Sequence, residues 1–152
     1  MLLIIGYGNP LRSDDAVGQH VTWALAERLP PGRVLVVTAH QLTPELAEGI
    51  SHADTVIFID AREGGQPGHI HKQVVVPAHP TGAFTHHVSP ASLLAASQSL
   101  YGSVPDGILI TIVGDSFEFG TELSPKLSAQ FDLITEQVLR LIQIAREEKA
   151  NA

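Results

Sequence analysis

The chain has 152 residues, which is long enough for one domain with a single hydrophobic core. Its 16 acidic side chains against 9 basic ones argue against nucleic acid or an anionic membrane as the main partner. The chain contains no cysteine, so it has neither a disulfide framework nor a thiolate for catalysis.

No apolar run approaches the length of a membrane-spanning helix, and the apolar start at residues 1–5 is too short for a signal peptide. We therefore expect a cytoplasmic monomer with no membrane or nucleic-acid partner. Residues 1–152 are expected to form one domain, with a polar, frayed tail over residues 146–152. Eight histidines is a high number for this length and prompts a search for metal sites.

The first strand-to-helix turn, residues 6–18, is the segment around which we expect the site to form. Residues 2–5 are a continuous apolar run, typical of a strand buried on both faces. Ligands of open α/β sheets bind at the carboxyl ends of strands, where this turn lies. Apolar residues then recur every four positions, as in an amphipathic helix, at Val17, Val21, Leu25 and Leu29.

Two acids in this turn, Asp14 and Asp15, admit two interpretations. Ser13 is a good N-cap, so both acids can simply stabilise the first helical turn. Alternatively, one acid stabilises the helix start while the other points into the crevice as a metal ligand or acid–base group. A dinucleotide is not expected, because Leu11 replaces the third glycine of the fingerprint and two carboxylates would repel a pyrophosphate.

The second predicted strand, residues 33–37, leads into a turn that brings His40 to the carboxyl end of that strand. His40 can therefore reach the crevice, or it can bond to its own turn. Thr43 is expected to cap a helix that has Pro44 at its first position and runs to about residue 50.

The third predicted strand, residues 55–61, is apolar until it reaches Asp60. An aspartate buried there is costly unless it is paired, bound to a cation or open to the crevice. Asp60 is thus the strongest candidate after Asp15, although it can also serve only as partner to a nearby backbone amide.

Residues 69–74 follow a glycine-rich turn that is too short for a helical crossover, so we expect an antiparallel edge strand. His69 and His71 share one face of that strand and are interpreted as solvated, and Lys72 suits an exposed edge.

His86 and His87 end a long loop, immediately before a helix that is predicted to start at Ser89-Pro90 and end at Gly102. Adjacent side chains diverge, so at most one of the two histidines is expected to enter the site. The buried side of this helix is predicted to carry Leu93, Leu94 and Leu100.

The last strand is predicted over residues 108–113, and Ser124-Pro125 opens the final helix. The predicted core stripe of that helix is Leu127, Phe131, Ile134, Val138 and Leu141.

The spaced combination of these features resembles the [NiFe]-hydrogenase maturation proteases over essentially the whole chain. The resemblance implies a phosphorylase/hydrolase-like α/β fold of three layers. A mostly parallel sheet of about five strands, with one antiparallel edge strand, would carry helices on both faces. The features that carry the resemblance are Gly6-x-Gly-Asn-x-Leu-x-x-Asp-Asp-x-x-Gly18, the strand ending in Asp60, a histidine before the Leu93-Leu94 helix, and Gly120-x-x-Leu-Ser-Pro.

Members of that family cleave a short C-terminal extension from the hydrogenase large subunit once nickel has been inserted. Carried over to this chain, the catalytic and metal-binding residues are Asp15, Asp60 and His86. His86 is preferred over His87 because it stands eight residues before Leu94, which is the usual spacing in that family. The predicted substrate loop contains Gly8, Asn9, His40 and Gln41.

Two carboxylates and one imidazole suit Ni²⁺ or Zn²⁺, and three ligands leave open coordination positions. We expect the large-subunit precursor to be the partner and to supply the nickel. Whether the metal is catalytic or serves only recognition stays open at this point.

Two other functions are also compatible with the sequence. One is a nickel-dependent assembly factor that checks the precursor without cutting it. The other follows from Gly6-Tyr-Gly-Asn-Pro10, which resembles the opening of peptidyl-tRNA hydrolases. Those enzymes continue with a basic Arg-His-Asn segment, absent here, and need a positive surface for tRNA.

Overall fold

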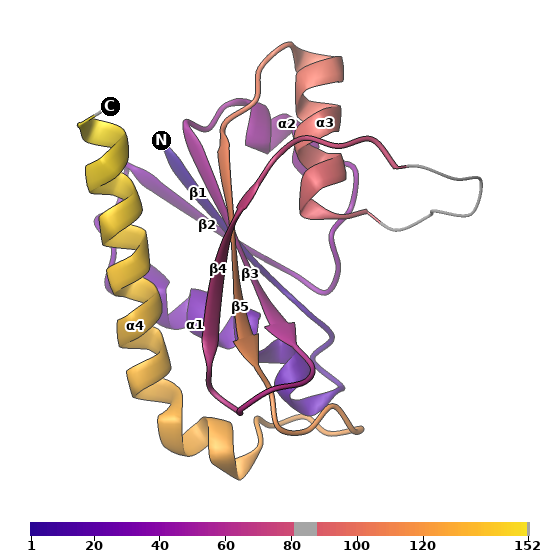
Figure 1. Ribbon diagram of the computed structural model, residues 1–152, viewed down its shortest axis with the longest axis vertical. Coiled ribbons are helices and arrows are strands. Elements are labelled where there is room, and N and C mark those ends of the chain that lie inside the picture. The colour runs from indigo at the N-terminus through magenta and orange to yellow at the C-terminus, as the bar shows by residue number, and fades with distance from the viewer. Residues whose placement is uncertain (81–87, 152) are drawn as a thin grey trace.

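The computed structural model describes residues 1–80 and 88–151, which form a twisted sheet with helices on both faces (Figure 1). The sheet has five strands in the order β2-β1-β3-β5-β4. The first four of these in spatial order run parallel, and β4 pairs antiparallel with β5 at the edge. The predicted α/β fold class is therefore confirmed. The strands are β1 (Leu2–Tyr7), β2 (Val34–Ala39), β3 (Thr55–Arg62), β4 (Ile70–Val75) and β5 (Asp106–Val113).

Two helical layers cover the sheet, because each central strand is apolar on both faces. Leu2 and Ile4 of β1 pack into one core with helices α1 and α4. Leu3 and Ile5, which alternate with them, pack into a second core with α2 and α3. The helices are α1 (Val17–Ala26), α2 (Leu46–Ser51), α3 (Pro90–Tyr101) and α4 (Pro125–Ala150), and a 3-10 turn, η1 (Ser13–Ala16), precedes α1.

The chain leaves β1 and β3 toward opposite faces of the sheet. The connection after β1 passes through α1, whereas the connection from β3 to β5 includes α3 on the other face. In open α/β sheets such a divergence between neighbouring strands creates the crevice in which ligands bind. The fold thus places a candidate site at the carboxyl ends of β1 and β3.

Most of the predicted apolar stripes are buried. Val17, Val21 and Leu25 of α1 are inaccessible to solvent, and Leu127, Ile134 and Val138 of α4 are buried. The prediction that Leu100 lies on the buried side of its helix is wrong, because this residue is 71% exposed. All residues of the last turn of α3, 98–101, are exposed, so this turn lies outside the core.

Two helix starts differ from the predictions. Helix α1 begins at Val17 instead of directly after Ser13, because residues 13–16 form the separate 3-10 turn. Helix α2 begins at Leu46, after a turn in which the carbonyl of Thr43 accepts from the Leu46 amide. The side chain of Thr43 does not cap it.

The tail that we expect to be frayed is helical over most of its length. Helix α4 continues through Arg146 to Ala150. Residues 146–150 are mainly strong helix formers, and the ammonium group of Lys149 lies 2.8 Å from a carboxylate oxygen of Asp106. No helix within residues 1–80 and 88–151 is long and apolar enough to cross a membrane.

Candidate active site

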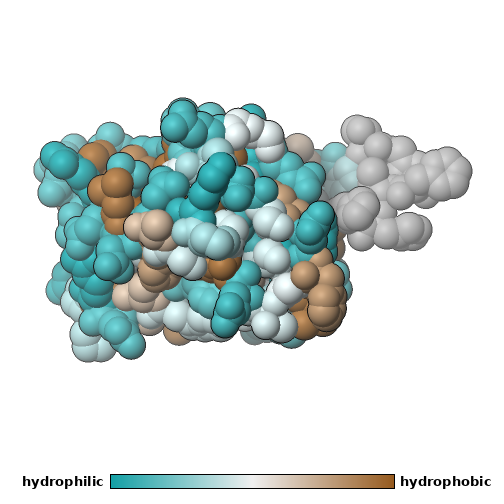
Figure 2. Space-filling view, turned by 90° about the horizontal axis from the view of Figure 1, so that it is seen from below, coloured by the Kyte–Doolittle hydropathy of each residue, from teal (hydrophilic) through white to brown (hydrophobic). Residues whose placement is uncertain are grey.

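A pocket of about 500 Å³ lies where β1, β2 and β3 end. The face of the molecule at the carboxyl ends of the parallel strands is mostly hydrophilic, with hydrophobic patches toward its sides (Figure 2). Two carboxylates enter the pocket from different elements. The pocket is lined by Tyr7, Gly8, Asp15, His40, Gln41, Leu42, Thr43, Pro44, Asp60 and Val88.

Asp15 reaches the pocket because two glycines let the turn η1 pack directly against the ends of β1 and β3. A Cβ atom on Gly8 would collide with the carbonyl oxygen of Asp15, and one on Gly18 would collide with the carbonyl oxygen of Ile59. The backbone amide of Asn9 donates to Oδ2 of Asp15 at 2.8 Å, which fixes the carboxylate. Any larger residue at either glycine would move Asp15 away from β3.

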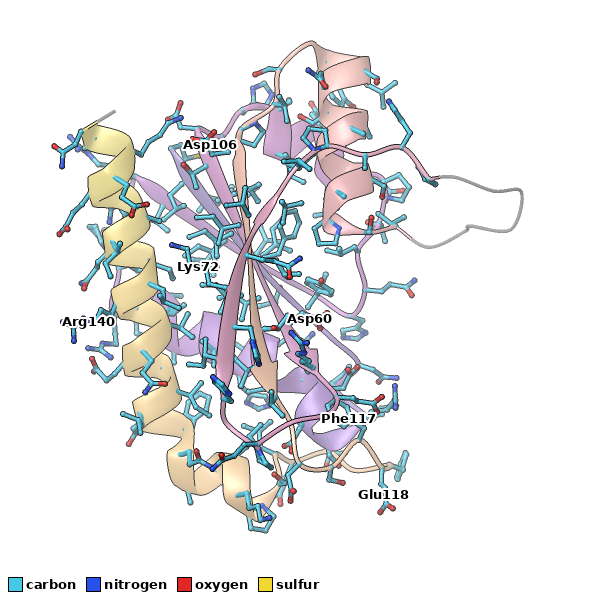
Figure 3. The ribbon with its side chains drawn as sticks, viewed as in Figure 1. Asp60, Lys72, Asp106, Phe117, Glu118 and Arg140 are labelled. Carbon is cyan, nitrogen blue, oxygen red and sulfur yellow. The ribbon has the colours of Figure 1, made fainter. Side chains whose placement is uncertain are left out.

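Asp60 enters the pocket from the carboxyl end of β3, well away from α4 (Figure 3). Its Oδ1 accepts a hydrogen bond from the amide of Ala61 at 2.8 Å. Burial raises the pKa of Asp60 to about 6, and the charge of Asp15 adds to this increase, while hydrogen bonds from Ala61 and Tyr7 oppose it. Asp60 therefore titrates just below neutral pH, and perturbed acids of this kind are typical of functional sites.

Tyr7 is a pocket residue that the sequence analysis missed. Its phenol is hydrogen-bonded to the carboxylate of Asp60. Burial raises the pKa of Tyr7 far above its usual value, and the charges of Asp60 and Asp15 raise it further. Tyr7 is therefore a permanent hydrogen-bond donor that orients Asp60. Tyr7 lies between the two glycines of the Gly6-Tyr-Gly8 turn. Nothing in the sequence around it indicates that its partner is Asp60.

Asp14 does not stabilise the start of the helix that follows it, a role that the sequence suggested. It is fully buried, and its carboxylate accepts from the backbone amides of Asp115 at 2.8 Å, Ser116 at 3.0 Å and Ser124 at 2.7 Å. Because α1 starts only at Val17, neither Asp14 nor Asp15 lies in its first turn. Asp14 instead joins the β1–α1 turn to the β5–α4 loop, and Asp15 is the acid that faces the pocket.

The β1–α1 turn and the β5–α4 loop are joined by further contacts beside Asp14. Ser13 donates from its amide to the carbonyl of Gly120 and from its hydroxyl to the carbonyl of Glu118. Gly120 in turn donates to the carbonyl of Leu11 at 3.0 Å. These contacts hold the segment that carries Asp15 from the side opposite the pocket.

The remaining candidate residues are placed as follows. Gly8, His40 and Gln41 line the pocket, whereas Asn9 contributes the amide that binds Asp15. His86 and His87 lie outside the described residues. Within residues 1–80 and 88–151, no three His, Cys, Asp or Glu side chains gather closely enough to hold a metal ion.

His71 lies on the antiparallel edge strand β4 and His69 directly precedes it, and neither lines the pocket. Their rings stack at a centroid distance of 4.5 Å. His69 is exposed and His71 is partly exposed. Lys72, which follows His71 in the sequence, is exposed at the edge, as predicted.

The chain is thus an α/β protein with two carboxylates in an open pocket at the carboxyl ends of its parallel strands, where ligands of such sheets bind. No protein-family model matches the chain. A hydrogenase 2 maturation protease from Escherichia coli K12 is 28% identical over 152 residues, which cover 93% of this chain and 90% of the relative.

Solved structures give the same result. The hydrogenase maturating endopeptidase HybD from Escherichia coli aligns with a TM-score of 0.74 and 27% identity, over 95% of this chain and 93% of the other. A [NiFe] hydrogenase maturation protease from Thermococcus kodakarensis aligns with a TM-score of 0.69 and 26% identity, over 96% and 90%. Over almost its whole length, this chain is therefore similar in sequence and fold to hydrogenase maturation proteases.

Proposed function

We propose that this protein removes the C-terminal extension of a [NiFe]-hydrogenase large-subunit precursor after nickel has been inserted. The observation that carries the proposal is the pair of carboxylates, Asp15 and Asp60, which reach one pocket from separate elements. The nickel is part of the substrate: the precursor carries it, and residues of the protease complete its coordination. His86 is the proposed third ligand.

Three features support this assignment. Carboxylate oxygens and one imidazole form a donor set that suits Ni²⁺. Val88 lines the pocket, and His86 stands only two residues before it in the sequence. The pocket is also open on the side of His40 and Gln41, which are both exposed and are the proposed contacts to the substrate.

The residues of this chain have distinct roles in the proposed cleavage. Asp15 and Asp60 bind the nickel held by the precursor and so position the scissile peptide beside the pocket. Asp60 also accepts a proton from an attacking water and returns it to the leaving amine. Nickel, when bound, polarises the adjacent carbonyl or the water.

The test is incubation of a nickel-loaded precursor with the purified protein, followed by mass spectrometry of the large subunit. A mass loss equal to a C-terminal peptide supports the protease, and an intact precursor that stays bound supports a non-cleaving assembly factor. Asp60→Asn should abolish cleavage. Asp106→Asn is the matched control, because Asp106 is an exposed acid at the opposite end of the sheet (Figure 3).

A further inference from the structure

The free edge of the sheet at β2 is an unpaired strand that leads directly into the pocket. β2 pairs only with β1, and among the described residues no other strand follows it in the sheet. The carbonyls of Arg33 and Ala39 accept from Leu2 and Gly8 at the two ends of the β1–β2 pair. Because backbone direction alternates along a strand, the amides and carbonyls of Val34, Val36 and Thr38 point away from β1.

The two edges of the sheet differ in the way that they are protected. The edge strand β4 carries Lys72, and a lysine at an edge discourages pairing with another chain. β2 reads Val34-Leu-Val-Val-Thr-Ala39 and contains no charged residue, and Leu35 is 47% exposed. An uncharged, apolar edge with free backbone groups is a template for an added strand.

β2 is also continuous with the proposed active site. It ends at Ala39, and the next residues, His40 and Gln41, already line the pocket. A strand added along β2 would therefore have one end in the pocket beside Asp15 and Asp60.

We propose that β2 binds the C-terminal extension of the precursor as an added antiparallel strand. This inference rests on the proposed function. The folded, nickel-containing body of the precursor must sit at the pocket, so the flexible residues after the scissile bond extend away from it. Running from the pocket toward Val34, they are antiparallel to β2. The strand spans roughly 20 Å, which accommodates about six extended residues.

Recognition of this kind reads the backbone of the extension and depends little on its side chains. The direct test uses nickel-loaded precursors in which one backbone amide of the extension at a time is N-methylated. Wild-type protein should cleave them with a two-residue periodicity: kcat/KM falls roughly 3- to 10-fold where the amide faces β2 and changes little at the positions between. An effect with no periodicity, or no effect, overturns the inference.

This experiment separates the two proposals. If the unmodified precursor is not cleaved, the proposed function fails and the inference falls with it. If the unmodified precursor and all the N-methylated ones are cleaved at one rate, the proposed function stands and only the strand addition is contradicted.

A pair of proline variants tests the edge from the side of the protein. Proline is tolerated on edge strands where the lost N–H faces solvent. Val36→Pro removes an outward amide of β2, and Val74→Pro is the matched control on the other edge. Val113 donates to His69, so by alternation the amide of Val74 also points outward.

Val36→Pro should raise KM for the precursor about 5-fold, the effect of losing roughly one hydrogen bond. Val74→Pro should leave KM unchanged, and thermal melting confirms that both variants are folded. If Val36→Pro fails to fold, the N-methyl series, which uses the wild-type chain, still decides the question. If Val36→Pro dissociates a dimer without changing cleavage, the edge belongs to a second copy and the inference is overturned.

Discussion

The phenol of Tyr7 is hydrogen-bonded to the carboxylate of Asp60 across the junction between β1 and β3. This contact joins two adjacent parallel strands at the point where the chain leaves them toward opposite faces of the sheet. It stabilises the ionised form of Asp60 in a position where burial and the charge of Asp15 both disfavour ionisation.

Replacing Tyr7 should therefore change the titration of Asp60. Tyr7→Phe removes the hydrogen bond and keeps the ring, so the pKa of Asp60 should rise from about 6 by about 1. An NMR titration of the Asp60 carboxyl measures it directly. Tyr101→Phe is the control, because Tyr101 is 49% exposed at the end of α3. An unchanged Asp60 titration in Tyr7→Phe would mean that the phenol does not act on Asp60.

Substitutions of the neighbouring acids Asp14 and Asp15 should have different effects, one on stability and the other on activity. Asp14→Ala leaves one buried and two part-buried backbone amides without their acceptor, so the free energy of unfolding should fall by about 3 kcal/mol. Asp15→Ala should cost about 1 kcal/mol or less, because it removes one contact from the amide of Asn9, yet it should abolish cleavage. Urea denaturation and precursor cleavage measure the two effects, and the opposite pattern would show that the roles are exchanged.

Asp14 and Asp60 should make the free energy of unfolding depend on pH with opposite signs. Burial alone would raise the pKa of Asp14, but the amides of Ser124, Ser116 and Asp115 outweigh burial and lower it. Its contribution to stability is thus complete above about pH 4 and is lost as the pH falls further. Asp60 has a raised pKa, so the folded state retains a proton that the unfolded state has released between about pH 4 and 6.

Stability should therefore fall as the pH rises through that interval, by at most about 3 kcal/mol and less where water enters the pocket. Asp60→Asn should remove this decrease, whereas Asp14→Asn should leave it in place. Denaturation of the metal-free protein at a series of pH values checks both. A decrease that persists in Asp60→Asn would assign it to another group.

The histidine pair offers a test with an internal control. His86→Ala should abolish cleavage of the nickel-loaded precursor, because His86 is the proposed third ligand. His87→Ala should keep most of the activity, since adjacent side chains diverge. Rates from a gel-based cleavage assay decide between them, and loss of activity only in His87→Ala would move the ligand by one residue.

The elements that the sequence predicted well are those with a local signal. The apolar run of β1, the four-residue stripe of α1 and the antiparallel edge strand with Lys72 all follow from spacing within a few residues. The approach of Asp15 and Asp60 also follows from the rule that strand ends meet at one edge of the sheet.

Contacts between distant parts of the chain explain what was missed. The partners of Asp14 lie 101 to 110 residues away, so its position beside Ser13 suggested only a helix cap. The partner of Tyr7 is on another strand. A single residue between two glycines belongs to no periodic pattern from which that contact could be predicted. Lys149 at the end of α4 contacts Asp106, which is 43 residues away and comes close only in the folded chain.

In the proposed function, Asp15 and Asp60 recognise nickel carried by the precursor. The most direct measurement compares cleavage of nickel-loaded and nickel-free precursor by protease that has been treated with a chelator and then freed of it. The proposal predicts that the treated protease cleaves the nickel-loaded precursor at its full rate and leaves the nickel-free precursor intact. Cleavage of nickel-free precursor by metal-loaded protease, with loss of all activity after chelation, would contradict it, because the metal would then reside in the protease.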